Sequence, residues 1–351
     1  MDKIRVISVD DSALIRKLMK DKLGAIEGIE VIATAPDPFI AAEKIKQLSP
    51  DVVTLDIEMP RMDGLTFLGK LMKIKPLPVI MVSSLTEKGA EKTIQAINEG
   101  AFDFILKPDV HSADGILDIF ISELAAKVKS AGRESLLKKR FEGHRQRETE
   151  KTRVAPKTSC SEDLIAIGAS TGGTEVIARI LSSMPVECPG IVVTQHMPPK
   201  FTKAFADRID TMSQISVKEG EDGEYIRRST AYIAPGGYQM YVRKKGGCLI
   251  LAVKDDPPHN RHCPSVDMLF YSIAENMPKT VHAMILTGMG SDGADGITRL
   301  KDHGARTIAQ DRESSVIFGM PKEAIERGKI DRVLNIDQIV DYLNREYAPQ
   351  Q

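Results

Sequence analysis

The chain has 351 residues, of which 28% are charged and 42% are hydrophobic, and its formal net charge at pH 7 is -1. This length is enough for two domains that each bury a hydrophobic core. The balanced charge provides no overall electrostatic attraction for nucleic acid or for a membrane surface. We therefore expect a soluble protein that neither binds nucleic acid nor inserts into a membrane.

The N-terminus enters a strand-like run at once, without the basic start, apolar core and cleavage site of a signal peptide. No apolar run approaches the roughly 20 residues of a membrane span. The cysteines are Cys160, Cys188, Cys248 and Cys263. They form no C-x-x-C pair, and this scatter favours a reducing compartment over a disulfide framework. These features predict a cytoplasmic location.

The first 126 residues, the predicted first domain, alternate strand-like and helical patterns. Five apolar runs are typical of strands: Ile4–Val9, Glu30–Ala35, Val52–Leu55, Val79–Val82 and Phe104–Leu106. This alternation predicts an α/β domain with a doubly wound parallel sheet, covered by helices on both faces. In such sheets, functional residues gather at the carboxyl ends of the strands.

Charged and hydroxyl side chains follow these predicted strands. Asp10 and Asp11 follow the first strand and Asp56 follows the third. Three carboxylates repel one another unless a hard cation lies among them, so the cluster predicts a bound Mg²⁺. Ser83 and Lys107 follow the fourth and fifth strands, where a hydroxyl and an ammonium suit phosphoryl transfer to a carboxylate. Each acid taken alone could instead be a solvated loop residue or a helix cap.

This region resembles the receiver domain of bacterial response regulators. The resemblance rests on V-D-D-S at Val9–Ser12, T-L-D-I-E-M-P-R-M-D-G at Thr54–Gly64, V-S-S at Val82–Ser84 and K-P at Lys107–Pro108. It implies a flavodoxin-like fold, a phosphoacceptor at Asp56, and a histidine kinase as phosphodonor. It implies Mg²⁺ ligands at Asp10, Asp11 and Asp56, and switch residues at Ser83, Phe104 and Lys107.

Strand signals vanish between residues 127 and 157, where basic residues outnumber acidic ones. The first part can extend a helix, but Gly143–Pro156 has almost no apolar residue to bury. We predict a basic, polar linker over residues 127–160. The alternative is a basic segment that docks on an acidic surface or on nucleic acid.

A small-residue turn at Gly168–Gly173 joins a strand-like run, Leu164–Ile167, to an amphipathic helical pattern. Its G-A-S-T-G sequence fits the nucleophile elbow, which exposes a serine at a sheet edge beside the N-terminus of a helix. Ser170 is therefore a candidate nucleophile. The alternative is a turn that binds phosphate or nothing, although it lacks the lysine of a P-loop and the spacing of a dinucleotide site.

A second set of strand-like runs follows: Ile191–Gln195, Ala231–Ala234, Leu249–Val253, His282–Leu286 and Thr307–Gln310. They predict a second α/β domain with a mostly parallel sheet over residues 161–348. His196 and Asp292 also follow predicted strands, so they should share one sheet edge with Ser170. An imidazole can take the serine proton and a carboxylate can orient the imidazole. The order Ser, His, Asp differs from that of the α/β-hydrolases, so that fold is not implied.

The second half of the chain resembles the catalytic domain of the CheB family, the chemotaxis protein-glutamate methylesterases. The resemblance rests on G-A-S-T-G-G, Q-H-M-P, I-A-P-G-G, R-H-C-P-S-V-D, L-T-G-M-G-S-D-G and A-Q-D-R-E-S-S-V-I-F-G-M-P. It implies Ser170 as nucleophile, His196 as general base and acid, and Asp292 as orienting carboxylate, with no cofactor for the esterase. Met289 would lie at the substrate edge, and backbone N–H groups near Thr171 and Gly172 would form the oxyanion hole.

The combined resemblance implies a phosphorylation-activated hydrolase that demethylates glutamates and deamidates glutamines of chemoreceptors, giving adaptation in chemotaxis. A transcriptional regulator is disfavoured because the second half is large, alternating and balanced in charge; a non-catalytic adaptor is disfavoured by the intact Ser, His and Asp. Gln239 and Arg312 depart from the residues common in the family. A zinc site at His259, His262 and Cys263 is disfavoured because a fourth spaced ligand is missing.

Overall fold

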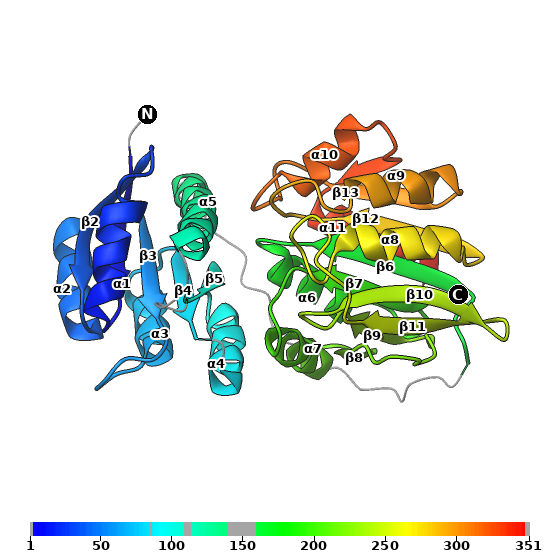
Figure 1. Cartoon of the computed structure of the whole chain (residues 1–351), viewed down its shortest axis with the longest axis horizontal. Coiled ribbons are helices and arrows are strands. Elements are labelled where there is room, and N and C mark those ends of the chain that lie inside the picture. The colour runs from blue at the N-terminus through cyan, green and yellow to red at the C-terminus, as the bar shows by residue number, and fades with distance from the viewer. Residues whose placement is uncertain (1–2, 85, 109–113, 139–158, 348–351) are drawn as a thin grey trace. The chain divides into compact units, whose positions relative to one another are not determined.

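The computed structural model describes residues 3–84, 86–108, 114–138 and 159–347 (Figure 1). The chain divides into two compact units, Met1–Arg147 and Glu148–Gln351. Most of the predicted linker lies at residues 139–158, outside the described residues. Within the described ranges, no helix has the length and apolarity to cross a membrane.

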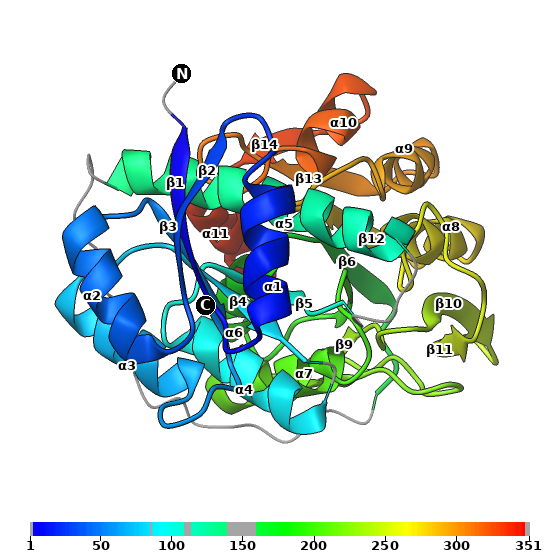
Figure 2. The same ribbon diagram turned by 60° about the vertical axis from the view of Figure 1, so that its left-hand side comes forward.

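The first unit is built on a five-stranded parallel sheet (Figure 2). Its strands are β1 (Ile4–Val9), β2 (Ile29–Ala35), β3 (Val52–Asp56), β4 (Val79–Ser83) and β5 (Asp103–Leu106). The order β2-β1-β3-β4-β5 is that of the flavodoxin-like doubly wound fold, which confirms the predicted architecture. The predicted strands differ from the observed ones by a residue at most at each end, because β-branched and other apolar residues fill the buried strands.

Helices cover the sheet of the first unit. They are α1 (Ala13–Leu18), which continues into the π-helical turn η1 (Met19–Leu23), α2 (Pro38–Leu48), α3 (Gly64–Ile74), α4 (Glu87–Asn98) and α5 (Asp114–Lys138). Side-chain caps define several starts: the Asp37 carboxylate accepts from two backbone N–H groups of α2, and the Asp63 carboxylate accepts from one of α3. Apolar residues of η1 and α5, such as Leu23 and Leu124, pack together in one buried core.

Helix α5 continues past residue 126, where the first predicted domain ends. Its buried apolar residues continue with Val128 and Ala131 at helical spacing. Lys127 is also buried, and its ammonium lies 2.8 Å from the Asp103 carboxylate on β5. This part of the helix is therefore held against the core of the first unit.

The second unit contains a seven-stranded sheet in which every pairing is parallel. Its strands are β6 (Asp163–Ala169), β7 (Gly190–Gln195), β8 (Ser216–Glu219), β9 (Thr230–Ile233), β12 (Thr280–Ile285), β13 (Arg306–Gln310) and β14 (Arg332–Leu334). They follow the order β14-β13-β12-β6-β7-β9-β8. The mostly parallel α/β prediction is confirmed, but the edge strands β8 and β14 are too short and too polar to have been predicted.

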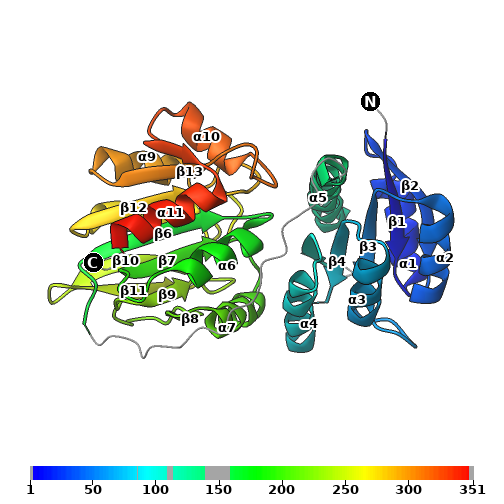
Figure 3. The same cartoon turned by 180° about the vertical axis from the view of Figure 1, so that it is seen from behind.

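Helices cover both faces of this sheet. Figure 3 shows α6 (Gly173–Ser183), α7 (Phe201–Met212) and α11 (Ile336–Tyr347) together on one side. The other side carries α8 (Val266–Glu275), α9 (Ala294–Asp302) and α10 (Met320–Glu326). A large hydrophobic core lies on this second side, where Phe270 and Ile297 pack toward strand residues such as Ala283.

One predicted strand, Leu249–Val253, lies outside the parallel sheet. It belongs to an antiparallel hairpin of β10 (Gln239–Lys245) and β11 (Cys248–Lys254), which packs beside α8. The two strands are joined through Gly246 and Gly247, which both have positive φ. A two-residue turn returns the chain antiparallel, whereas a parallel neighbour would need a longer crossover.

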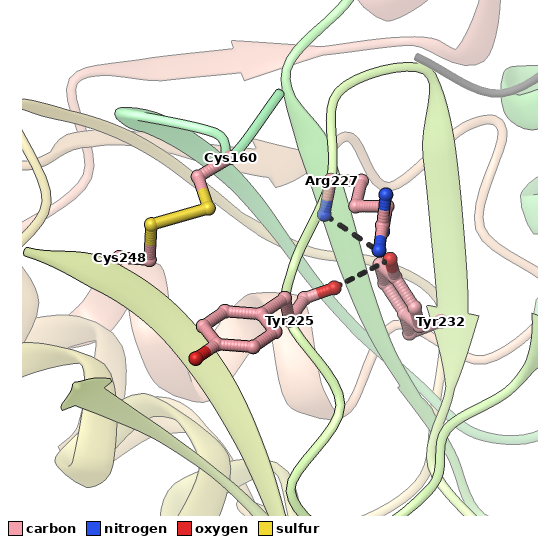
Figure 4. The surroundings of a disulfide bond; sticks show 5 residues. All are labelled: Cys160, Tyr225, Arg227, Tyr232 and Cys248. Atoms are coloured by element: carbon pink, nitrogen blue, oxygen red, sulfur yellow. Dashed lines mark hydrogen bonds between the residues drawn. A yellow bond between two sulfur atoms is a disulfide. The ribbon is translucent and has the colours of Figure 1, made fainter. Parts of the chain in front are cut away.

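A disulfide joins Cys160 to Cys248, with the two Cα atoms 5.8 Å apart (Figure 4). This bond contradicts the expectation, drawn from the scattered cysteines, of a reducing compartment rather than a disulfide framework. Cys188 and Cys263 are free thiols. Cys160 forms an isolated antiparallel β-bridge with Arg227. The neighbouring Ile226 donates its backbone N–H to the carbonyl of Leu249, the residue after Cys248. These tertiary contacts bring the two cysteines together. The bond therefore ties the beginning of the described second unit to the start of β11.

We expect reduction of this disulfide to destabilise the second unit by about 2–4 kcal/mol, because a cross-link between residues 88 apart restricts the unfolded chain. Urea unfolding of the full chain, with and without dithiothreitol, measures the effect. Cys160→Ser should match the reduced wild type under both conditions. Equal stability of oxidised and reduced wild type would contradict this account.

Candidate functional site

The first candidate site is an acidic cluster at the carboxyl edge of the first sheet. Asp10 follows β1 and Asp56 ends the neighbouring strand β3, so parallel pairing brings them together. Ligand oxygens of Asp10, Asp11 and Asp56 lie within 4.8 Å of one another. Asp10 and Asp56 are buried and Asp11 is exposed. The predicted acidic cluster is therefore present in the structure.

Lys107, which follows β5, neutralises part of this charge. Its Nζ lies 2.7 Å from Asp56 Oδ2 and 3.0 Å from Asp10 Oδ2. Apart from these ion pairs, the two buried oxygens have no hydrogen-bond partner among the described residues. Carboxylate oxygens with unused acceptor capacity are the ligands that Mg²⁺ prefers, so the residues fit that ion.

Burial raises the pKa of Asp56 to about 6, and the neighbouring Asp10 carboxylate contributes to the rise. Burial likewise raises the pKa of Asp10, more than Lys107 lowers it. Burial opposes the charge of Lys107, but the two carboxylates outweigh it and raise the pKa of the ammonium. The cluster is therefore short of positive charge.

The remaining residues predicted for this site lie on the neighbouring strands. Ser83, at the end of β4, is buried, and its hydroxyl accepts a hydrogen bond of 2.8 Å from Thr93 on α4. Phe104 is buried on β5. Thr93 was not predicted, although a threonine at a buried position of α4 could have drawn attention to it. The Ser83 hydroxyl is thus held by α4.

The second candidate site begins at the elbow after β6, where Ser170 is followed by Thr171 and Gly172 before α6 starts. Gly172 has φ of 77°, and a Cβ atom there would lie 2.5 Å from a Val316 side-chain carbon. The position therefore requires glycine both for its backbone conformation and for space. The predicted strand-turn-helix is confirmed.

Ser170 is half-buried, and neighbouring segments hold its backbone in place. Its N–H donates to the Thr287 carbonyl at 3.0 Å, and its carbonyl accepts from Gln195 Nε2 at 2.8 Å. The backbone of Gly288 lies so close that a Cβ there would be 2.9 Å from Ser170 Cβ. Gln195, the last residue of β7, thus clamps the elbow, a contact that was not predicted from the sequence.

His196 and Asp292 form a hydrogen-bonded pair at the same edge. His196 follows β7, Asp292 lies between β12 and α9, and His196 Nε2 is 2.7 Å from Asp292 Oδ2. The backbone N–H of His196 donates to the carbonyl of Ala169, the residue before Ser170. Because β7, β6 and β12 are adjacent parallel strands, all three candidate residues reach one edge.

Asp292 is buried at the N-terminus of α8. It accepts hydrogen bonds from Ser265 Oγ at 2.8 Å and from the backbone N–H groups of Val266 and Asp267 at 2.7 and 3.2 Å. Burial opposes its charge, but the hydrogen bonds, above all that with His196, hold the pKa of Asp292 well below its usual range. Asp292 is thus a stable carboxylate.

Two residues at the start of α8, Ser265 and Asp267, were not predicted. Ser265 caps α8, a role for which a serine before V-D-M-L could have been a signal. Asp267 is buried, and its carboxylate accepts from the Gly296 N–H at 2.7 Å. Burial, with the charge of Asp292, raises the pKa of Asp267 to about 6. As pH falls, Asp267 therefore takes up a proton before Asp292 does.

The structure does not join Ser170 to His196 directly. His196 Nδ1 is buried and has no hydrogen-bond partner among the described residues, while Nε2 is occupied by Asp292. Such contacts are often long in a protein without substrate and tighten when substrate binds. Nδ1 is therefore the ring nitrogen with spare capacity for a proton.

The other positions singled out in the sequence surround this edge. Met289 is 47% exposed in the loop after β12. Thr171 is buried, and its carbonyl accepts from Thr287 Oγ1 at 3.0 Å. Arg312 stacks over the Phe318 ring at 5.5 Å, whereas Gln239 is fully buried. Met289 is thus the exposed apolar side chain among these positions, whereas Thr171 and Gln239 are buried.

The fold and the two sites define a receiver-type unit followed by an α/β unit that carries serine, histidine and aspartate at one sheet edge. The family model for the CheB methylesterase matches residues 165–343, and that for the response regulator receiver domain matches residues 6–113. The chain belongs to the CheB methylesterase family.

Individual relatives agree with this assignment. Over 339 residues the chain is 48% identical to the protein-glutamate methylesterase/protein-glutamine glutaminase of Salmonella typhi and to that of Escherichia coli O157:H7. Each match covers 97% of this chain and 95% of the relative. The crystal structure of the Thermotoga maritima CheB methylesterase catalytic domain is 39% identical, with a TM-score of 0.51, and covers 54% of this chain and 100% of that chain.

The raised pKa of Asp56 predicts a pH-dependent stability. The free energy of unfolding falls as pH rises from 3.8 to about 6, because Asp56 ionises more readily in the unfolded chain than in the folded one. Above about pH 6 the loss is complete. Without divalent cations, Asp56→Asn should therefore stabilise the first unit by about 1–3 kcal/mol at pH 7.5, and this gain should vanish near pH 4. Hydrogen exchange of β1 and β3 amides in the full chain measures it.

Asp11→Asn is the matched control, because Asp11 belongs to the same cluster but is exposed. It should stabilise the first unit less than Asp56→Asn does. Mg²⁺ should narrow the difference between wild type and Asp56→Asn, since a cation relieves the repulsion that the substitution removes. An Asp56→Asn gain that stays constant from pH 4 to 7.5 would contradict the buried-charge explanation.

Proposed function

We propose that this protein is a phosphorylation-activated serine hydrolase that removes methyl esters from glutamate side chains of chemoreceptors and deamidates receptor glutamines. The hydrogen-bonded His196–Asp292 pair beside the elbow of Ser170 is the observation that carries this proposal. Membership of the CheB methylesterase family, and the names of the 48% identical relatives, supply the substrate class. The reaction contributes to adaptation in chemotaxis.

In the first step, Ser170 Oγ attacks the ester carbonyl carbon and His196 Nδ1 accepts the hydroxyl proton. The Asp292 carboxylate holds Nε2–H, which fixes the tautomer and stabilises the imidazolium. The protonated His196 then gives its proton to the methoxy oxygen, and methanol leaves. The product of this step is an acyl-enzyme on Ser170.

In the second step, water attacks the acyl-enzyme and loses its proton to His196. Collapse of the intermediate breaks the bond to Ser170 Oγ, which takes the proton back, and a glutamate carboxylate is released. A glutamine amide follows the same route with ammonia as the leaving group. The two activities therefore share one set of residues.

Two features of the edge suit the charge and shape of the reacting group. Backbone N–H groups near Thr171 and Gly172, at the start of α6, serve as the oxyanion hole, where the positive end of the helix adds to the stabilisation. The exposed Met289 offers apolar contact to the substrate beside Ser170. No cofactor takes part in these steps.

The receiver unit supplies the control. Asp56 accepts a phosphoryl group from the chemotaxis histidine kinase, and Lys107 is placed to pair with the added charge. Asp10, Asp11 and Asp56 would hold Mg²⁺, which neutralises phosphoryl oxygens during transfer. Ser83 and Phe104 would change position in response to phospho-Asp56, and the active population of the enzyme would rise.

We propose a cytoplasmic location, where the kinase and the methylated parts of the receptors would be accessible. For the units we propose a receiver domain over residues 1–126, a linker over 127–160 and a catalytic domain over 161–348. The apolar residues of α5 support a receiver helix that continues into the proposed linker.

Ser170→Ala should lower methanol release from a methylated receptor fragment at least 1,000-fold, roughly the loss when a catalytic serine is removed. Asp292→Asn should cause a loss of similar order, because the tautomer of His196 is no longer fixed. Gas chromatography measures the methanol, and thermal unfolding verifies that both variants fold. Ser170→Ala activity within a few-fold of wild type would refute the nucleophile.

Activation should depend on Asp56. Adding a small phosphodonor with Mg²⁺ should raise methanol release by the wild type, because phosphorylation shifts the population to the active state. Asp56→Asn should retain basal activity and lose the response. If both proteins respond equally, or neither responds, the regulatory part of the proposal is wrong while the esterase assignment stands.

A further inference from the structure

The rings of His262 and His196 lie face to face. Their centroids are 3.7 Å apart and their planes differ by 9°. The only hydrogen bond of the His196 ring within the described structure is the one from Nε2 to Asp292. One hydrogen bond fixes a direction but leaves the ring free to turn about that direction. A flat group packed on the ring face removes this freedom.

His262 is itself held in a tight turn. The backbone N–H of His259 donates to the His262 carbonyl at 3.0 Å, and the reverse bond measures 2.8 Å. The buried Gln239 adds a bond of 3.0 Å from Nε2 to the same His262 carbonyl, and its Oε1 accepts from the Ser265 N–H at 2.8 Å. The departure from the family at Gln239 thus anchors this loop.

The same loop contacts two of the proposed catalytic residues. Its His262 covers the face of His196, and its Ser265 hydroxyl donates to Asp292. The described residues form no cluster of three metal-ligating side chains here, and the neighbouring His259 ring instead meets the edge of Tyr271 at 6.1 Å. The His262 side chain therefore packs against the proposed catalytic histidine rather than binding a metal ion.

The charge of the pair is consistent with this arrangement. Burial, with smaller contributions from His196 and Arg261, lowers the pKa of His262 to about 4, although the charge of Asp292 opposes the shift. His262 is consequently neutral at pH 7. A neutral aromatic face can stabilise the imidazolium that His196 becomes during the reaction, whereas a second cation would repel it.

We propose that His262 is a positioning residue of the ester hydrolysis, whose ring fixes the plane of the His196 imidazole while Asp292 fixes its direction. This inference rests on the proposed function of Ser170, His196 and Asp292. It adds a residue that contacts the general base rather than the substrate. It therefore predicts an effect on kcat, with little effect on KM.

Three variants of the full chain test the proposal: His262→Ala, His262→Phe and, as matched control from the same turn, His259→Ala. Methanol release from the methylated receptor fragment is measured after activation with phosphodonor and Mg²⁺. His262→Ala should lower kcat about 10- to 100-fold, the cost of a misplaced catalytic group, with KM nearly unchanged. His262→Phe should restore most of kcat, and His259→Ala should resemble wild type.

Nuclear magnetic resonance of histidine-labelled chain gives a second measurement that needs no turnover. The His196 ring signals should move in His262→Ala, because the ring current of the stacked partner is lost, and should largely return in His262→Phe. Thermal unfolding identifies any variant that fails to fold.

Unchanged kcat and unchanged His196 signals in His262→Ala would overturn the proposal. So would a raised KM with unchanged kcat, which would place His262 against the substrate. A His262→Phe variant as slow as His262→Ala, despite restored His196 signals, would overturn the role of stacking. A wild type that releases no methanol would refute the proposed function, and with it this role, whereas a loss confined to His262→Ala supports both.

Discussion

The proposed catalytic edge depends on the parallel pairing of β12, β6 and β7. In this register Ala169 is opposite Gln195, and Gly168 is opposite Ile285. Ser170 and His196 therefore leave the sheet at the same level, and the loop after β12 brings Asp292 to meet them. A register shift on either side would separate the histidine from the serine or from the carboxylate, since side chains alternate between faces along a strand.

The buried carboxylates Asp292 and Asp56 have opposite electrostatic surroundings in the two units. Asp292 accepts from His196, a serine hydroxyl and the N-terminus of α8, so its charge is stabilised in the folded protein. Asp56 has the shared Lys107 and the backbone N–H of Glu58 against burial and the repulsion of Asp10, and its charge remains costly. A permanently charged residue suits the orientation of an imidazole. A residue with unmet acceptor capacity suits a site that gains a cation and a phosphoryl group.

The hairpin of β10 and β11 lies outside the parallel sheet, yet it supports the proposed catalytic edge. Gln239, the first residue of β10, anchors the loop that bears His262 and Ser265. Cys248, the first residue of β11, is bonded to Cys160 near the start of β6. The hairpin thus connects the stability of the second unit to the placement of residues that contact His196 and Asp292.

The sequence by itself determined the two α/β units, most strands of both sheets, and the candidate residues at the strand ends, because buried parallel strands are apolar runs followed directly by polar residues. Only the tertiary structure decided the cysteine pairing, the hairpin position of Leu249–Val253, and the roles of Gln195, Gln239 and His262. These contacts join residues distant in the chain, and their geometry follows from strand order and loop packing. Local periodicity carries no information about either.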